Sequence, residues 1–229
     1  MHLRPHQQRA FAAMQNNNAG QIIVPTGGGK TYIMIADAYK HLRDSGPQTI
    51  VVVAPRILLA NQLCEEFMEH IHHRDVHVCH AHSGETHYFS STKPEKIALF
   101  NNTARAAGEN CIIFTTYHSL HRVVDSGIDI NTIYFDEAHN GTAKSFFRSV
   151  FATAQYVQRR YYFTATPKTG RGVSVARGMN NTDVWGGVLC NVPAQELIAS
   201  GAIVPPKVVP FETNRIRTKH NAHDVDADN

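Results

Sequence analysis

A lysine and a threonine that follow three consecutive glycines are the residues of this chain best placed to hold a phosphate. They close the stretch VPTGGGKT, residues 24–31, between an aliphatic run and a segment with helical periodicity. Backbone N–H groups of a glycine-rich turn converge on anionic oxygens, and the next helix adds the positive end of its dipole. Lys30 would reach the β- and γ-phosphates of a nucleotide, and the Thr31 hydroxyl would ligate magnesium.

The strict phosphate-loop pattern asks for a glycine where this chain has Val24. The alternative is a glycine-rich turn that binds nothing. The order of strand, loop, Gly-Lys-Thr and helix argues against that alternative, because it is the context in which such a loop works. The predicted nucleotide-binding residues of the loop are Thr26, Gly27, Gly28, Gly29, Lys30 and Thr31.

Two adjacent carboxylates follow an apolar run in TIYFDEAHN, residues 132–140. A phosphate loop needs such a carboxylate-bearing strand beside it, to hold magnesium and to activate water. Asp136 lies where ligands bind in open α/β sheets, at the carboxyl end of a strand. We expect Asp136 to hold magnesium through water, and Glu137 to orient and deprotonate the attacking water.

Short aliphatic runs that alternate with helix-like segments predict a doubly wound α/β domain with a parallel sheet covered on both faces. The predicted strands are Gln21–Val24, Thr49–Ala54, Val76–Cys79, Cys111–Thr115, Thr132–Phe135 and Arg160–Thr164. The predicted helices are Thr31–Leu42, Ile57–Ile71 and Ala143–Ala154, while Lys96–Ala107 fits either a helix or a strand. The polar stretch Ser83–Pro94 is expected to be a surface loop, and the chain from Arg215 onward a tail or linker.

Composition places the chain among ordinary globular proteins. Of its 229 residues 42% are hydrophobic and 18% charged, and the net charge of +3 permits a nucleic-acid partner without requiring one. The four cysteines show no C-x-x-C spacing, which favours a reduced intracellular protein. The N-terminus lacks the apolar core of a signal peptide and no apolar run reaches membrane length, so we expect a cytoplasmic location with no membrane partner.

The pair PTGGGKT and DEAH resembles the motif pair of superfamily two helicases and translocases. The proline and the missing upstream glycine are usual in that family. The resemblance implies a RecA-like fold, the cofactors ATP and Mg²⁺, and a catalytic set of Lys30, Asp136, Glu137 and His139. It extends over nearly the whole chain, from Leu3 to about Pro210.

Further stretches resemble motifs of this family in the expected order. LRPHQ, residues 3–7, resembles the adenine-recognition motif, in which Gln7 would read the base edge and Arg4 or Leu3 would pack on the base. FTATP, residues 163–167, resembles the motif that couples nucleotide state to domain movement, with Thr164 and Thr166 bonding near His139. PAQELIASGAIVPP, residues 193–206, resembles a closing helix and exit strand.

Two stretches resemble the nucleic-acid contacts of the family. VAPRILLANQ, residues 53–62, would place Arg56 and a helix N-terminus against a phosphate. FTTYHSL, residues 114–120, would contribute Thr115 and Thr116, with Thr116 the stronger candidate. The APRILLA and TATP sequences, and VPTGGGKT in place of GETGSGKT, resemble the branch of type I and type III restriction-enzyme motor subunits and phage DNA helicases. That resemblance implies duplex or branched DNA as the partner.

Other interpretations remain open from the sequence. The chain could act on RNA, it could be a nucleotide-gated binding module without directional motion, or it could be an ATPase acting on protein alone. The family works with two RecA-like domains, and no arginine motif of a second one occurs here. We expect a first domain over residues 1–212, a polar linker over 213–229, and a second domain in cis or as a partner subunit. Alone, the chain should be nearly inactive as an ATP hydrolase.

Histidines crowd residues 70–87, with Cys79 among them. Histidine and cysteine are the usual ligands of zinc, but the spacing here matches no closed zinc pattern. Alternation along a strand over Val76–Cys79 would also turn these side chains to opposite faces. Surface histidines are the preferred interpretation, and no metal site is predicted from them.

Overall fold

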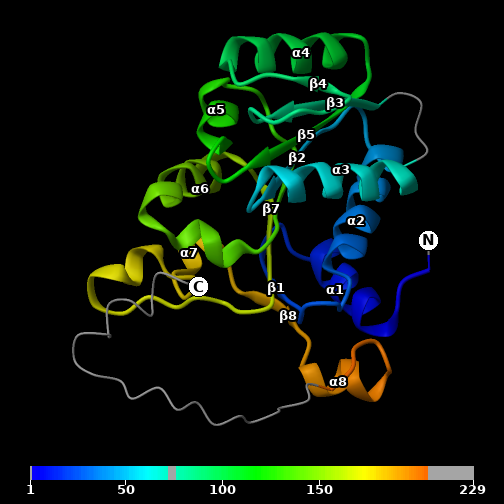
Figure 1. Ribbon diagram of the computed structural model, residues 1–229, viewed down its shortest axis with the longest axis vertical. Helices are drawn as coiled ribbons and strands as arrows, with labels where there is room; N and C mark the ends of the chain where they lie inside the picture. The colour runs from blue at the N-terminus through cyan, green and yellow to red at the C-terminus, as the bar shows by residue number, and fades with distance from the viewer. Residues whose placement is uncertain (1, 72–75, 206–229) are drawn as a thin grey trace, which may run out of the picture.

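The computed structural model describes residues 2–71 and 76–205, which contain one sheet of eight parallel strands. Its strand order is β4-β3-β5-β2-β6-β7-β1-β8, so β1 lies near one side and the chain crosses over repeatedly (Figure 1). The strands are β1 (Ala19–Ile23), β2 (Thr49–Ala54), β3 (Val76–Ala81), β4 (Phe89–Ser90), β5 (Asn110–Thr116), β6 (Thr132–Phe135), β7 (Arg159–Thr164) and β8 (Val188–Asn191).

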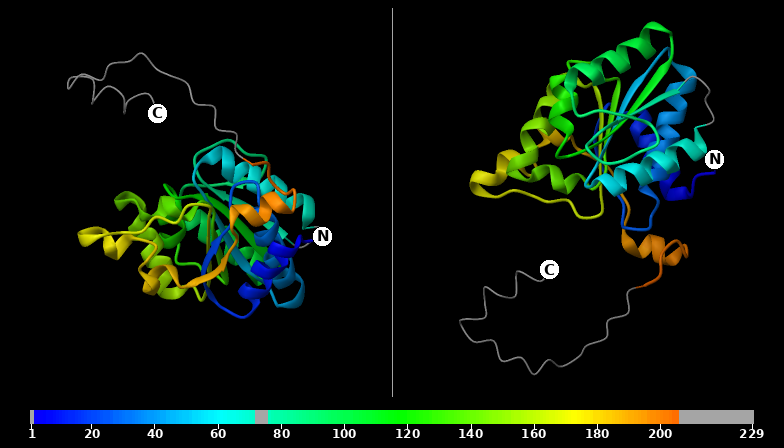
Figure 2. Two further views of the ribbon diagram at one scale, coloured as in Figure 1. Left: turned by 90° about the horizontal axis from the view of Figure 1, so that it is seen from below. Right: turned by 45° about the horizontal axis from the view of Figure 1, so that its top comes forward.

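Helices cover both faces of this sheet. One face carries α1 (Pro5–Gln15), α2 (Lys30–Asp44), α3 (Ile57–His70) and α8 (Ala194–Ala199), whose buried residues share one apolar cluster. The other carries α4 (Pro94–Ala106), α5 (Leu120–Asp125), α6 (Lys144–Tyr156) and α7 (Thr182–Trp185). Figures 1 and 2 show these two layers on either side of the strands. Two short 3₁₀ helices, η1 (Ala138–Thr142) and η2 (Gly172–Arg177), follow β6 and β7.

The central strand β2 explains why both faces must be covered. Ile50 and Val52 pack into the cluster with α1, α2 and α3, whereas Val51 and Val53 pack into the cluster with α4 to α7. Successive strand residues point to opposite faces, so an unbroken aliphatic run is buried only when helices lie on both sides. The predicted doubly wound α/β fold is therefore confirmed.

The predicted strands and helices are all present, with ends that differ by at most two residues. The ambiguous segment Lys96–Ala107 belongs to α4, and the polar stretch Ser83–Pro94 is a loop that includes the short β4. The predicted closing helix is α8, but no exit strand forms between it and residue 205. The predicted linker over residues 213–229 lies outside the described residues. No helix in the described part of the chain is long and apolar enough to span a membrane.

A buried carboxylate ties the first layer together. Asp37 of α2 is fully buried and accepts hydrogen bonds from Tyr134 of β6 at 2.6 Å, Arg159 of β7 at 2.9 Å and Gln15 of α1 at 2.6 Å. Burial alone would raise the pKa of Asp37, but His41, Arg159 and Tyr134 outweigh it and lower the pKa below its usual value. The helix that follows the glycine-rich loop is thus fixed to two strands of the sheet.

Candidate active site

Three neighbouring strands carry the glycine-rich loop and the two motifs expected beside it. In the order β6-β7-β1, DEAH follows β6, TATP overlaps the end of β7, and PTGGGKT follows β1. The carboxyl ends of parallel strands meet at one edge of the sheet, so the three motifs converge although more than a hundred residues separate the glycine-rich loop from the other two. This edge is the candidate active site.

The glycine-rich loop needs its glycines for two different reasons. Gly27 and Gly29 adopt φ of 80° and 76°, in the left-handed region that side chains disfavour. Gly28 is a matter of space, because a Cβ there would lie 2.5 Å from Val24 Cγ1 and 2.9 Å from Leu197 Cδ1. Val24, which stands where the strict loop pattern has a glycine, is fully buried and belongs to the core beneath the loop.

Helix α1 holds the loop from one side. Gln7 Nε2 donates to the carbonyl oxygens of Gly28 and Gly29 at 3.4 and 3.2 Å, and its Oε1 accepts from the Arg4 backbone N–H at 2.8 Å. His6 Nε2 lies 2.8 Å from the same Gly28 oxygen. Both polar ends of the Gln7 amide are therefore engaged within the protein, while the Arg4 side chain is exposed.

The two catalytic candidates Lys30 and Glu137 meet directly. Lys30 Nζ lies 2.9 Å from Glu137 Oε1, with side-chain exposures of 10% and 26%. A lysine that follows a glycine-rich loop and faces a carboxylate in this way holds a positive charge where phosphate oxygens would come. The structure thus brings the two motifs to one point.

The backbone of Glu137 is unusual. Its φ of 45° and ψ of 55° make it the one non-glycine residue with positive φ in residues 2–71 and 76–205. Such a conformation costs on the order of 1 kcal/mol and persists only where the surroundings impose it. Asn140 helps to impose it, since its Nδ2 donates to the Glu137 carbonyl oxygen at 2.8 Å. The strain therefore falls on the residue predicted to activate water.

His139 connects the DEAH and TATP motifs. Its Nδ1 lies 3.0 Å from Thr164 Oγ1 and 3.5 Å from Glu137 Oε2. The backbone N–H of Thr166 donates to the same Thr164 hydroxyl at 3.1 Å, while the Thr166 side chain is exposed. One imidazole thus contacts the Glu137 carboxylate, which follows β6, and the threonine that ends β7, which is the arrangement expected for a coupling motif.

Asp136 is held through its backbone and carries a perturbed carboxyl. Its N–H donates to the Val53 carbonyl oxygen and its own carbonyl accepts from the Tyr117 hydroxyl, both at 2.8 Å. Burial and the neighbouring Glu137 charge raise the pKa of Asp136 to about 6, against the opposing effect of Lys30. A carboxylate and the Thr31 hydroxyl are oxygen donors of the kind that Mg²⁺ prefers, so the residues present fit that ion.

The nucleic-acid candidates differ in their accessibility. Arg56 is exposed at the start of α3. Thr115 is fully buried and its hydroxyl donates to the Ala81 carbonyl oxygen at 2.9 Å, so the expected contact does not fit this side chain. Thr116 is 3% exposed and its hydroxyl accepts from the Ser119 N–H at 3.3 Å, so its contact would require a change of partner.

The histidine-rich segment forms a buried pair, and His72 and His73 lie outside the described residues. His80 Nδ1 lies 2.9 Å from His82 Nε2, and burial lowers the pKa of His80 to about 4. Among residues 2–71 and 76–205, no three histidine, cysteine, aspartate or glutamate side chains are grouped to hold a metal ion.

Three contributors to the site were not singled out in the sequence. His6 contacts the loop, Asn140 holds Glu137, and Asp37 fixes α2 to the sheet. His6 stands inside LRPHQ and Asn140 directly follows DEAH, so their places beside motifs were the available signals. Asp37 offered no local signal, because its partners Tyr134 and Arg159 are about a hundred residues away.

Comparison with known proteins adds a family and a fold. The sequence family described as "Type III restriction enzyme, res subunit" matches residues 1–169. No curated protein matches the chain. A solved structure of a nuclease-deletion mutant of the type ISP restriction-modification enzyme LlaGI, in complex with a DNA substrate mimic, is 20% identical with a TM-score of 0.72. The match covers 88% of this chain and 21% of that one.

Two helicases share the fold. The UvsW helicase from bacteriophage T4 is 12% identical with a TM-score of 0.60, over 82% of this chain and 60% of that one. The Hef helicase domain of Pyrococcus furiosus is 22% identical with a TM-score of 0.58, over 81% of this chain and 37% of that one. The α/β domain described above therefore has the RecA-like fold of helicases, and it spans only part of each of these proteins.

Proposed function

The chain belongs to the family of the type III restriction enzyme res subunit, and from this premise we propose that it is the ATP-binding motor domain of a DNA helicase or translocase. The observation that carries the proposal is the 2.9 Å ion pair between Lys30 and Glu137, which unites the glycine-rich loop with the DEAH motif. Family membership supports an ATPase of the helicase type. The finer statements about residues, DNA and movement are our proposal.

Each residue of the site has a role in ATP hydrolysis. Lys30 exchanges Glu137 for the β- and γ-phosphates, and the loop from Thr26 to Gly29 cradles those phosphates with its N–H groups. Thr31 and Asp136 would hold a magnesium ion, which neutralises phosphate charge when bound. Released from Lys30, Glu137 orients a water molecule and takes its proton.

His139 links the nucleotide site to the end of β7. Because it contacts both Glu137 and Thr164, a change at the carboxylate alters the hydrogen bond at the end of β7. Thr164 also accepts from the Thr166 N–H, so the change reaches the loop that follows β7. We propose that this path couples hydrolysis to the position of a second RecA-like domain.

A second RecA-like domain, in cis or as a partner subunit, completes this proposal. The chain covers only 21% of LlaGI and 37% of the Hef helicase domain structure, which leaves room in such proteins for further domains. Arginines from the second domain would neutralise charge on the transferred phosphoryl group and are worth roughly 10³ to 10⁵ in rate in related enzymes. Residues 1–229 alone should therefore bind ATP weakly and hydrolyse it slowly.

DNA is the proposed nucleic-acid partner for two reasons. The matched family is that of a restriction enzyme, and the structure of the LlaGI mutant contains a DNA substrate mimic. Exposed Arg56 at the start of α3 is the best-placed of the expected phosphate contacts. A nucleotide-gated binding module, or an RNA helicase, would use the same ATP site. A binding module without directional motion would not need a second domain that closes on the first, and an RNA helicase would bind RNA in place of DNA.

Filter binding with short DNA and RNA duplexes, combined with steady-state ATPase assays, tests the proposal. We expect residues 1–229 to retain duplex DNA at low salt in preference to duplex RNA, and to show near-background ATPase activity that DNA does not stimulate. Binding of RNA alone would replace the DNA assignment. Robust DNA-stimulated turnover by a verified monomer would overturn the two-domain mechanism.

A further inference from the structure

The loop that follows the TATP motif contributes only Met179, near its end, to the core. Its 3₁₀ helix η2 has no buried residue, and Val173 within it is fully exposed. In Figures 1 and 2 the η2 segment, coloured yellow, projects on the opposite side of the sheet from α1 and α2. Hydrophobic burial therefore does not explain why this segment takes a defined shape.

Hydrogen bonds and two close backbone approaches shape the loop instead. Asn180 Oδ1 accepts from the Gly170 N–H at 2.7 Å, Asn180 Nδ2 donates to the Gly170 carbonyl at 3.3 Å, and the Met179 N–H donates to the Lys168 carbonyl at 2.9 Å. A Cβ on Gly170 would lie 2.2 Å from the Ser174 oxygen, and one on Gly178 would lie 2.1 Å from the Gly170 nitrogen. Only glycine allows both approaches, so the loop closes on itself.

The closed loop forms one wall of a small cationic pocket. The pocket has a volume of about 180 Å³, and its other wall is the segment that joins η1 to α6. No carboxylate lines it, and none of its cations forms an ion pair among the described residues. Its charged and hydroxyl-bearing residues are Lys144, Lys168, Arg177, Thr142, Thr169 and Ser174.

One of these cations has a buried donor atom. Arg177 Nε is buried and has no hydrogen-bond partner in the described structure. Leaving a buried donor on a charged group without a partner is unfavourable, so an acceptor placed beside it would be favoured. Three cations and hydroxyl donors around a space of this size suit an oxyanion, above all a phosphate.

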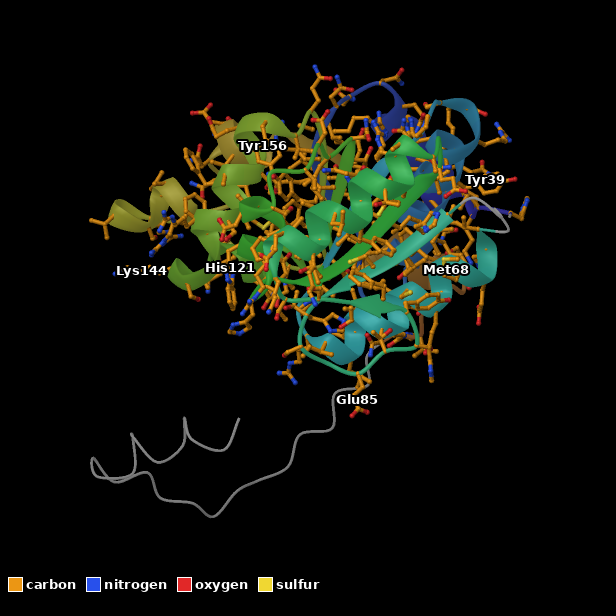
Figure 3. All side chains as sticks on the ribbon, turned by 90° about the horizontal axis from the view of Figure 1, so that it is seen from above. Tyr39, Met68, Glu85, His121, Lys144 and Tyr156 are labelled. Carbon is orange, nitrogen blue, oxygen red and sulfur yellow. The ribbon has the colours of Figure 1, made fainter. Side chains whose placement is uncertain are left out.

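We propose that this pocket binds a backbone phosphate of DNA, and that it extends the DNA track beyond the motifs shared by the family. The proposal rests on the function proposed above. The pocket shares no residue with the glycine-rich loop, which argues against a nucleotide phosphate as its ligand. One wall of the pocket follows DEAH in the chain and the other follows TATP, and Figure 3 shows Lys144 on the side where η2 projects.

The test measures the affinity of residues 1–229 for a short blunt-ended DNA duplex between about 50 and 200 mM salt. The variant is Lys168→Ala/Arg177→Ala. Its matched control is Lys40→Ala/Lys96→Ala, which removes the same charge from α2 and α4. We expect the variant to bind about 10-fold more weakly at low salt, and the slope of log affinity against log salt to become shallower by about 0.9, the value for one phosphate. The control should keep the wild-type slope.

The outcomes separate the two proposals. If the wild type binds no DNA at the lowest salt, the proposed function fails and the pocket loses its ligand with it. If the wild type binds DNA and the pocket variant has the same affinity and salt slope as the control variant, the pocket is not a phosphate site. This holds both when neither variant loses affinity and when both lose it equally through their lower net charge. Thermal unfolding of the double variant checks its fold. The single variant Arg177→Lys should bind DNA more tightly than the double variant and more weakly than the wild type, because it keeps the positive charge without the guanidinium fork.

Discussion

Asp37→Asn should be among the most destabilising conservative substitutions in this domain. The side chain is fully buried, and Arg159, whose side chain is 18% exposed, would lose the carboxylate that neutralises it. Breaking a buried ion pair by removing one partner costs about 3–5 kcal/mol, and we take the lower value because Arg159 retains some access to water. For a domain of 150–250 residues that loss lowers Tm by roughly 6–12 °C.

Chemical denaturation and thermal unfolding measure this effect, with Asp44→Asn as the control on the same helix. Asp44 is exposed and pairs with Lys40 and Arg43 at the surface, so its loss should produce no measurable change. A double-mutant cycle with Arg159→Met should give a coupling between about 0.5 and 3 kcal/mol. A loss below about 1 kcal/mol for Asp37→Asn, or additive effects in the cycle, would refute the reasoning.

The pH dependence of the difference in unfolding free energy between the wild type and Asp37→Asn gives a second check. The folded-state pKa of Asp37 is depressed below its ordinary value of 3.8, so the unfolded chain binds the proton more readily. The stabilisation from the carboxylate is therefore complete above pH 3.8 and is lost as pH falls through the folded-state pKa. The gap in stability between the wild type and Asp37→Asn should be constant near neutral pH and should narrow below 3.8.

Three further substitutions address the candidate active site. Glu137→Gln should abolish ATP hydrolysis in the protein completed by its second domain while leaving nucleotide binding nearly intact, and turnover near the wild-type rate would refute the assigned base. Gln7→Ala should erode a preference for ATP over GTP in competition binding, and equal binding of GTP by the wild type would remove Gln7 from base recognition. Gly28→Ala should cost about 1–3 kcal/mol in denaturant unfolding, because its Cβ would meet Val24 and Leu197, and an unchanged midpoint would contradict the packing described for the loop.

The sequence predicted the sheet because its core strands are mostly short aliphatic or aromatic runs, as buried strands between two helical layers require. The glycine-rich loop and the DEAH motif were equally predictable, because the residues of each motif are contiguous in the sequence. The helix α1 was not predicted, because LRPHQQRAFAAMQ has little apolar periodicity and its helix is stabilised by packing on α2 and β8. Partners distant in sequence, such as Asp37 with Arg159, were likewise beyond local patterns.

The same limit applies to side-chain exposure. Thr115 and Thr116 stand in a stretch that resembles a nucleic-acid motif, but neighbouring strands decide which of their hydroxyls are buried. The cationic pocket is another case, because Lys144 comes from the start of α6 while Lys168 and Arg177 come from the loop after β7. Only the strand order places these two segments together.

Equilibrium binding of a fluorescent ATP analogue with Mg²⁺, measured on the wild type and on Lys30→Ala, tests whether this domain holds a nucleotide through its glycine-rich loop. We expect weak but saturable, magnesium-dependent binding by the wild type, and a loss of most of that affinity in Lys30→Ala because the lysine is the charge that faces the phosphates. Thermal unfolding of both proteins without nucleotide serves as the check on folding. Wild-type protein that binds no nucleotide, or Lys30→Ala that binds it as tightly as the wild type, would contradict the account.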